Sequence, residues 1–185
     1  MFVRQGPRSN YCAPYATAAF VGLLGQPMGR AEALRTFRTR RAGWRGASRA
    51  DIARVVCEAC PGVRASWQHV HAASAGDLLG RLREAWDGRP LLATASCLLL
   101  RHQVTDRHTF VIVALADEAV KIIDPLFRPP AAGQCGNMEL RLVDGRAQTS
   151  NPSSRLAWAI DLGQPLCLMR WSTQAGAEPA PAVRS

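Results

Sequence analysis

Residues 5–20 read QGPRSNYCAPYATAAF, and the rest of the chain is organised around this stretch. Turn-forming residues precede Cys12, whereas small and apolar residues with the composition of a buried helix follow it. We therefore predict a loop that delivers Cys12 to the first turn of a helix. The positive end of a helix dipole lowers the pKa of a thiol, and the thiolate is the nucleophilic form. Gln5 carries a side-chain NH2 that can join the Cys12 backbone N–H in holding an oxyanion. The alternative is that Cys12 simply packs as a small hydrophobic residue.

The length of the chain, 185 residues, is typical of one domain, and its 48% hydrophobic content is enough for a substantial core. We expect a single domain over residues 1–174, followed by a flexible tail over 175–185, where Pro179 and Pro181 lie among small residues. No apolar run is long enough to span a bilayer, and the N-terminus lacks the pattern of a secretory signal. These features predict a protein made in the cytoplasm without a membrane partner.

The formal net charge is +9, and 22 of the 23 basic residues are arginine. An arginine cluster that could bind nucleic acid, phosphate or an acidic partner comprises Arg35, Arg38, Arg40, Arg41, Arg45 and Arg49. Aromatic residues hardly interleave with this cluster, and the chain contains no nucleic-acid motif. A solvated basic loop is therefore the favoured interpretation, and no nucleic-acid partner is expected.

The six cysteines are irregularly spaced, so they do not indicate a disulfide framework, and reduced thiols are expected. Cys57 and Cys60 have metal-ligand spacing, and His69 and His71 follow, so a zinc site is one possibility. The two cysteines lie in a predicted helix, however, and His-Val-His is typical of a strand with outward-facing histidines. A single CxxC is a weak signal, so we predict neither a metal nor another cofactor.

Helices fill the first half of the chain and strands the second, which predicts an α+β domain with an antiparallel sheet. Ser48 with Asp51, and later Ser74, have the positions of helix N-caps. The predicted helices after the Cys12 helix cover residues 30–40, 51–60 and 77–86, and the predicted strands cover 63–70, 91–100, 108–115, 119–123, 138–143 and 165–171. Most of the five tryptophans are expected in the core: Trp44, Trp67, Trp86, Trp158 and Trp171.

A histidine and an aspartate flank the hairpin predicted around residues 116–118. His108 begins one strand, eight residues before Ala116, and Asp124 ends the next, eight residues after it. In a regular antiparallel hairpin these two residues would lie directly opposite each other on one face. His108 could then take the proton of Cys12 while Asp124 fixes its tautomer. His102 is the second candidate for the base.

The order Gln5, Cys12, His108 and Asp124 resembles that of the papain-like cysteine peptidases, closest to the bacteriocin-processing (C39-like) branch and related bacterial effector proteases. The resemblance covers residues 5–125. It implies a papain-like fold, in which a helical lobe carries Cys12, a sheet lobe carries His108 and Asp124, and the site lies in the cleft between them. Gln5 would be the oxyanion donor. Ala13 departs from the glycine usual in the C39-like branch, and no transporter segment is present.

The predicted function is hydrolysis of a peptide bond in a protein or peptide substrate through an acyl-enzyme on Cys12. The resemblance also implies a secreted bacterial effector acting on a host or target-cell protein, and we expect a monomer. The same triad can instead transfer the acyl group to an amine or deamidate a glutamine, because all three reactions share the acyl-enzyme. A non-enzymatic binding domain that uses the basic surface is the remaining alternative.

Overall fold

The computed structural model describes residues 11–38, 46–101, 103–116, 119–128, 130–151 and 156–173. In these ranges four helices and eight strands form an α+β domain, as predicted. The helices are α1 (Cys12–Leu23), α2 (Arg30–Thr36), α3 (Arg49–Ala59) and α4 (Ala75–Ala85). The strands are β1 (Val63–Val70), β2 (Leu91–Leu99), β3 (Val104–Leu115), β4 (Ala119–Ile123), β5 (Met138–Val143), β6 (Arg146–Thr149), β7 (Trp158–Ile160) and β8 (Leu166–Thr173). Of the helices described, none is both long and apolar enough to cross a bilayer.

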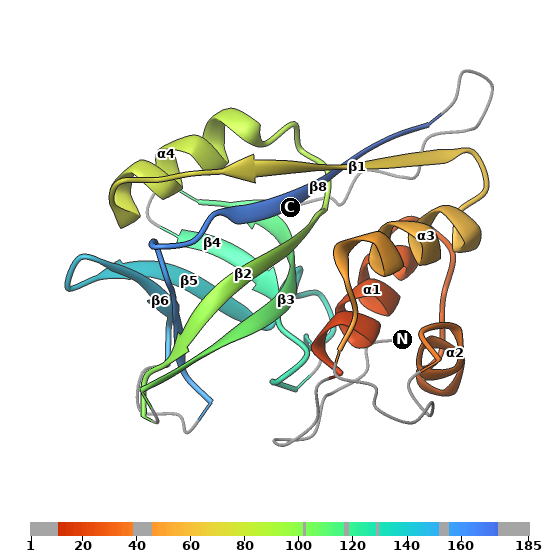
Figure 1. The fold of residues 1–185 in the computed structure, drawn as a ribbon, viewed down its shortest axis with the longest axis horizontal. Helices are drawn as coiled ribbons and strands as arrows, with labels where there is room; N and C mark the ends of the chain where they lie inside the picture. The colour runs from red at the N-terminus through yellow and green to blue at the C-terminus, as the bar shows by residue number, and fades with distance from the viewer. Residues whose placement is uncertain are drawn as a thin grey trace.

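The strands form one antiparallel sheet in the order β1-β8-β2-β3-β4-β5-β6-β7. An additional pairing of β7 with β2 closes the last six strands of this order into a barrel-like ring, while β8 and β1 extend from it. Helices α1, α2 and α3 gather beside one side of the sheet, and α4 lies apart from them near the far end of β1 (Figure 1). The helices α1 and α3 pack against the sheet, α1 on β3 and β2 and α3 on β1.

Two apolar clusters hold these parts together. The first joins the helices α1–α3 to one face of the sheet, where Leu92, Val111 and Met169 are fully buried. The second fills the interior of the barrel and includes Phe110, Trp158 and residues of α4. Burial of each large apolar side chain contributes roughly 1.5–3 kcal/mol, so the first cluster fixes where α1 meets β3.

Local signals in the sequence placed the helix starts correctly. Ser48 and Asp51 form a capping box at α3: the Ser48 N–H donates to Asp51 Oδ2 at 3.0 Å, and the Asp51 N–H donates to Ser48 Oγ at 3.1 Å. Ser74 caps α4 in the same way by accepting from the Asp77 N–H at 3.1 Å. Both predicted caps are confirmed.

Two features of the sheet differ from the prediction. Strand β3 begins at Val104 rather than at His108, because its polar first part pairs with the end of β2 down to Leu99↔Val104. Strands β6 and β7 were not predicted at all. They are only four and three residues long, and the register of β2 and β5 defines them more than their own composition does.

Candidate active site

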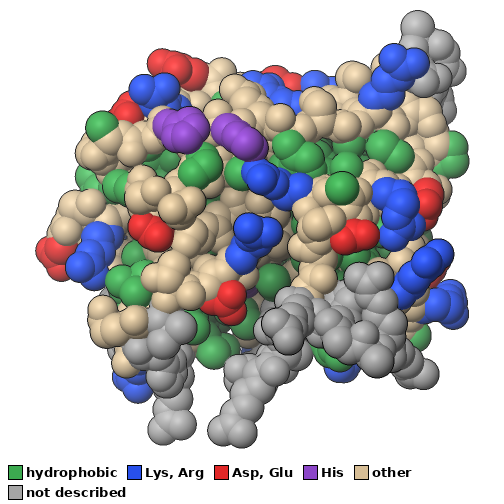
Figure 2. All heavy atoms as spheres, viewed as in Figure 1, with side chains coloured by type: hydrophobic (Ala, Val, Ile, Leu, Met, Phe, Trp, Pro, Cys, Tyr) green, Lys and Arg blue, Asp and Glu red, His purple; other side chains and the backbone are tan. Residues whose placement is uncertain are grey.

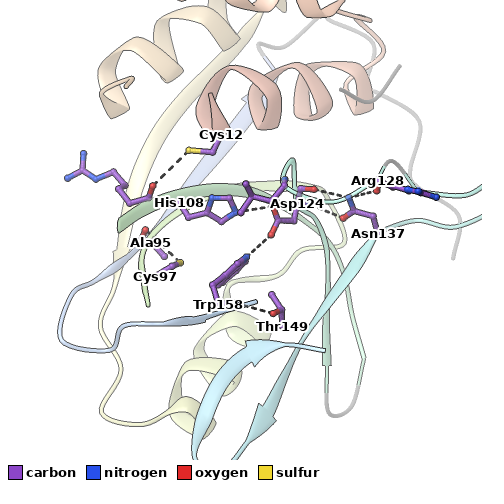
Figure 3. Close-up of polar contacts among 11 residues, drawn as sticks. Cys12, Ala95, Cys97, His108, Asp124, Arg128, Asn137, Thr149 and Trp158 are labelled. Atoms are coloured by element: carbon purple, nitrogen blue, oxygen red, sulfur yellow. Dashed lines mark hydrogen bonds and ion pairs between the residues drawn. The ribbon is translucent and has the colours of Figure 1, made fainter. Parts of the chain in front are cut away.

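Cys12, His108 and Asp124 converge where the start of α1 meets β3 (Figure 3). Cys12 is the first residue of α1, and Tyr11 is its N-cap. The half-buried thiol donates to the backbone carbonyl of Arg107 at 3.9 Å, so the sulfur lies beside the strand that carries His108. The structure therefore places Cys12 at the start of a helix, as predicted.

His108 and Asp124 form a buried pair. The Nε2 atom of His108 lies 3.0 Å from Asp124 Oδ1. The exposed fraction is 6% for His108 and zero for Asp124, so water does not screen their interaction. Because Nε2–H donates to the carboxylate, Nδ1 is the ring nitrogen left to exchange a proton with Cys12.

The predicted register of this pair is wrong by two residues. Val111 pairs with Ile123 and Ile112 with Ile122, and this register, continued by one residue, brings Asp124 level with Phe110 instead of His108. The two residues still share a face, because side chains in a strand alternate with a period of two. They are diagonal neighbours, and the long histidine side chain covers the difference.

The hairpin is centred further along the chain than Ala116, since Leu115 pairs with Val120, and a β-bulge at Val113 then shifts the register back by one residue. Near the tip of the hairpin Ala114 pairs with Lys121, but past the bulge Ile112 pairs with Ile122. One residue of β3 is thus left out of the ladder. If Val113 instead paired within the ladder, the tip register would continue, and His108 and Asp124 would point to opposite faces.

Asp124 is held by donors on both carboxylate oxygens. Oδ1 accepts from the backbone N–H of Leu126 at 2.8 Å as well as from His108. Oδ2 accepts from the indole N–H of Trp158 at 2.6 Å. The Trp158 ring also packs edge-on against His108, at 5.1 Å between centroids, and lies at the same distance from Phe110. The carboxylate is therefore fixed in one orientation toward the imidazole.

Asn137 holds the backbone on which Asp124 sits. Its Oδ1 accepts from the Asp124 N–H at 2.7 Å, and its Nδ2 donates to the Asp124 carbonyl at 2.8 Å and to the Arg128 carbonyl at 2.8 Å. The preceding Gly136 runs so close to β4 that an added Cβ would lie 2.7 Å from the Ile122 carbonyl oxygen. Only glycine lets this loop approach β4 closely enough.

Strand β3 loses its neighbour beside Cys12. Strand β4 stops pairing at Ile123, and the residue that would come level with Thr109 is Pro125, which has no N–H. Alternate residues of a strand direct their N–H and C=O groups to the same side, so Arg107 and Thr109 share the direction in which Val111 bonds to β4. In the described part of the chain no strand continues the sheet there. The Cys12 thiol lies against this free edge.

The electrostatics favour a charged Cys12–His108 pair. Burial alone would lower the pKa of His108, but the charge and hydrogen bond of Asp124, together with Cys12, raise it to about 10. Burial would raise the pKa of Cys12, but the hydrogen bond and charge of His108, with hydrogen bonds from the backbone and side chain of Thr109, lower it overall. At neutral pH the arrangement therefore favours thiolate and imidazolium.

Other predicted candidates do not join this site in the described residues. Gln5 and His102 lie outside those residues. Cys57 is exposed and Cys60 buried, and no cluster of three or more metal-ligating side chains occurs where the structure is described. Arg49 is not part of a solvated loop: its guanidinium donates to Cys167 Sγ at 2.6 Å and lies 2.7 Å from His69 Nε2. Arg40, Arg41 and Arg45 lie outside the described residues, and Figure 2 shows basic and acidic side chains interspersed on one face.

Sequence reasoning missed three side chains of the site. Trp158 was assigned to the core without a polar role, Asn137 lies in a loop, and Thr109 was read only as part of an apolar strand. Gly136-Asn137 directly before a strand is a local signal for a tight approach, but it does not indicate which strand is approached. No pattern in the sequence connects Trp158 with Asp124, because they are 34 residues apart.

Comparison with solved structures finds chains of similar fold. No known protein family matches the chain, and no curated protein matches it. A protein of Bacillus anthracis, whose crystal structure is described as that of a proposed C39-like peptidase, aligns with a TM-score of 0.46 and 10% identity. The alignment covers 94% of this chain and 96% of that chain. At this level of identity the assignment of a function rests on the site itself.

Proposed function

We propose that this protein is a papain-like cysteine peptidase of the C39-like type, with Cys12 as nucleophile, His108 as acid and base, and Asp124 as the group that orients His108. The observation that carries the proposal is the convergence of these three side chains. His108 and Asp124 are 3.0 Å apart and buried, and the thiol lies at the helix start against Arg107. Nucleophile, base and orienting group are the parts that covalent hydrolysis needs.

The proposed reaction begins with the thiolate–imidazolium pair. The sulfur of Cys12 attacks the carbonyl carbon of a peptide bond, and the π electrons of the carbonyl move onto its oxygen. As the tetrahedral intermediate collapses, His108 gives its proton to the leaving amine and the C–N bond breaks. Water then gives a proton to His108 and attacks the thioester, which releases the acid and restores the pair.

The oxyanion would form beside the start of α1. The first N–H groups of a helix have no partner within the helix, so the backbone N–H groups of Cys12 and Ala13 are suited to hold it, whereas Pro14 contributes none. We propose Gln5 as the side-chain donor that completes this oxyanion site.

The free edge of β3 supports an extended polypeptide as substrate. Main-chain groups at a strand edge pair with an extended peptide, and beyond the two groups at Cys12 this edge continues toward Thr105, which alternates in phase with Arg107. We further propose that the chain acts as a monomeric domain on a protein of a host or target cell, delivered by a bacterial secretion system. The motif resemblance supports this role. Nucleic acid and membrane are not proposed partners.

The proposal is tested by the rate of Cys12 alkylation with iodoacetamide from about pH 5 to 9, compared in the native protein and His108→Ala, with Cys12→Ala as the blank. We expect fast labelling that persists to acidic pH and is lost in His108→Ala. Labelling that appears only near the pKa of a free thiol, about 8.5, and ignores His108 would overturn the assignment and favour a binding domain.

Product analysis then separates hydrolysis from the other acyl-enzyme reactions. The native protein and Cys12→Ala are incubated with a peptide library, and the products are identified by mass spectrometry. Two fragments that together contain one added water indicate hydrolysis. A joined peptide indicates acyl transfer, and a glutamate in place of a glutamine indicates deamidation; either of these without cleavage would replace the peptidase proposal.

A further inference from the structure

Thr109 directly follows His108 in β3, and its hydrogen bonds help to lower the pKa of Cys12. We propose that Thr109 is a catalytic residue, whose backbone N–H and side-chain hydroxyl both donate to the thiolate of Cys12. The inference rests on the proposed role of Cys12 as nucleophile. It adds Thr109 to His108 as a residue that stabilises the negative charge of the thiolate.

The backbone of Thr109 is directed at the sulfur by the geometry of the sheet. Its N–H points out of the edge that β4 leaves when it ends, in the same direction as the Arg107 carbonyl. The thiol of Cys12 contacts that carbonyl at 3.9 Å. The carbonyl of one residue and the N–H of the second residue after it are adjacent on a strand edge, so the N–H of Thr109 faces the same sulfur.

The side chain of Thr109 comes to the sulfur from the helix side of the sheet. Thr109 alternates in phase with Val111, which packs in the cluster that contains α1, so its hydroxyl is on the face from which Cys12 descends. Thr109 is only 2% exposed. His108 approaches from the opposite face, so the sulfur at the edge is reached by residues of both faces.

The electrostatics of Cys12 agree with this geometry. Burial raises the pKa of Cys12, and the groups that reverse this effect are His108 and then the backbone and side chain of Thr109. The two Thr109 donors are neutral, so their effect does not depend on the protonation state of His108. They would hold the thiolate at the strand edge before it attacks the carbonyl carbon, and again when it leaves the thioester.

The test uses Thr109→Val, which keeps the branched shape but removes the hydroxyl, and Thr109→Ser, which restores it. Thr94→Val is the matched control, because Thr94 lies directly opposite Thr109 and is 4% exposed. The pH dependence of Cys12 alkylation and of thiolate absorbance is measured in each intact protein. We expect the midpoint to rise by about one pH unit in Thr109→Val and to stay within a few tenths in the other two.

A midpoint of Thr109→Val that equals that of the native protein would overturn the proposal, as would an equal rise in Thr94→Val. Circular dichroism checks folding, and Thr109→Ala repeats the test if the valine variant does not fold. The measured quantity is the ionisation of the Cys12 thiol, not the cleavage of a peptide. If His108→Ala shifts the alkylation midpoint and Thr109→Val does not, only the Thr109 inference is refuted. If His108→Ala does not shift the midpoint, the proposed function is refuted.

Discussion

Cys12 and Cys97 are two free thiols beside the same His108–Asp124 pair, yet their environments drive them in opposite directions. Cys97 lies on β2 inside the barrel, is 2% exposed, and has its pKa raised well above the usual value by burial and by the nearby Asp124, Cys12, Asp106 and Asp161. Cys12 has its pKa lowered despite its burial. Burial raises the pKa of both thiols, so burial alone does not explain the opposite shifts.

What differs is the charge that each sulfur faces. Cys97 faces carboxylates, and its thiol donates to the Ala95 carbonyl at 3.9 Å. Cys12 faces an imidazole whose own proton is held by Asp124. A buried carboxylate therefore opposes one thiolate directly and supports the other through an intervening histidine.

The largest expected effect is the difference between removing Cys12 and removing Cys97. Cys12→Ala should abolish acid-pH alkylation and reduce peptide cleavage by about 10⁴-fold or more, because the nucleophile is gone. Cys97→Ala should retain both activities and lose about 1–2 kcal/mol of stability through the small cavity. Mass spectrometry of the alkylated peptides and urea denaturation measure the two outcomes. Cleavage that survives in Cys12→Ala would contradict the proposed nucleophile.

Asp124→Asn should raise the pKa of Cys12, and so make this thiol as unreactive as Cys97. The amide carries no charge to stabilise the imidazolium, so the pKa of His108 falls and that of Cys12 rises. We expect kcat/KM to fall by about 10³-fold and the alkylation midpoint to move to higher pH. Asp161→Asn is the control, because Asp161 accepts from Ser96 Oγ at 3.2 Å and is close to Cys97 rather than paired with His108. Equal losses in the two variants would show a general charge effect instead.

Trp158→Phe should weaken the pair without removing it. Phenylalanine keeps a ring against His108 but leaves Asp124 Oδ2 without its donor, which costs about 1–3 kcal/mol and about 10-fold in kcat/KM. Trp171→Phe is matched in chemistry, since Trp171 donates its indole N–H to the Pro90 carbonyl at 2.9 Å, away from the site. It should lose similar stability and no activity. A loss of activity in both variants would assign Trp158 a purely structural role.

The smallest effect concerns stability against pH. Between about pH 6.5 and 8.5 the folded pair holds one proton on His108 and the unfolded chain holds one on Cys12, so the native protein should be almost insensitive to pH. In Cys12→Ala the folded His108, still paired with Asp124, binds a proton that the unfolded chain has lost. Its stability is therefore fully present below about pH 6.5 and falls as pH rises, by at most about 1.4 kcal/mol per pH unit.

Urea denaturation of both proteins across this pH range measures the difference. Cys12→Ala combined with His108→Gln should be flat again, because the titrating group is gone. A flat profile in Cys12→Ala alone would mean that His108 is not protonated beside Asp124, and the charged pair would have to be abandoned.

Sequence alone predicted the features that depend on nearby residues. The caps at Ser48 and Ser74 and the strands β1, β4 and β5 depend on local patterns, and they were predicted with correct bounds. The α+β class followed from the order of these elements. The register of His108 with Asp124 was not predictable, because neither the centre of the hairpin nor a bulge in an apolar strand leaves a trace in hydropathy.

The side chains around Asp124 were hidden for a different reason. Asn137 and Trp158 approach it through loops and a three-residue strand, and their roles come from tertiary contacts over 13 and 34 residues. Composition and periodicity report only which residues are buried, and Trp158 was indeed expected in the core. Which buried donor meets which acceptor is decided by the closure of β7 onto β2.

Side chains along β3 alternate between two faces, so the number of residues between His108 and the bulge at Val113 decides which face His108 occupies. We call this count the frame of the strand. One residue gained or lost between His108 and Ile112 would turn the histidine to the other side of the sheet, whereas a change of two would restore its side. Removing Val113 itself would keep the frame, because the pairs on both sides of it already match β4. Length changes beyond Leu115, toward the tip, would leave the frame at His108 untouched. Related sequences can therefore differ in length at the tip of the hairpin. The segment from His108 to the bulge can change in length only by an even number of residues.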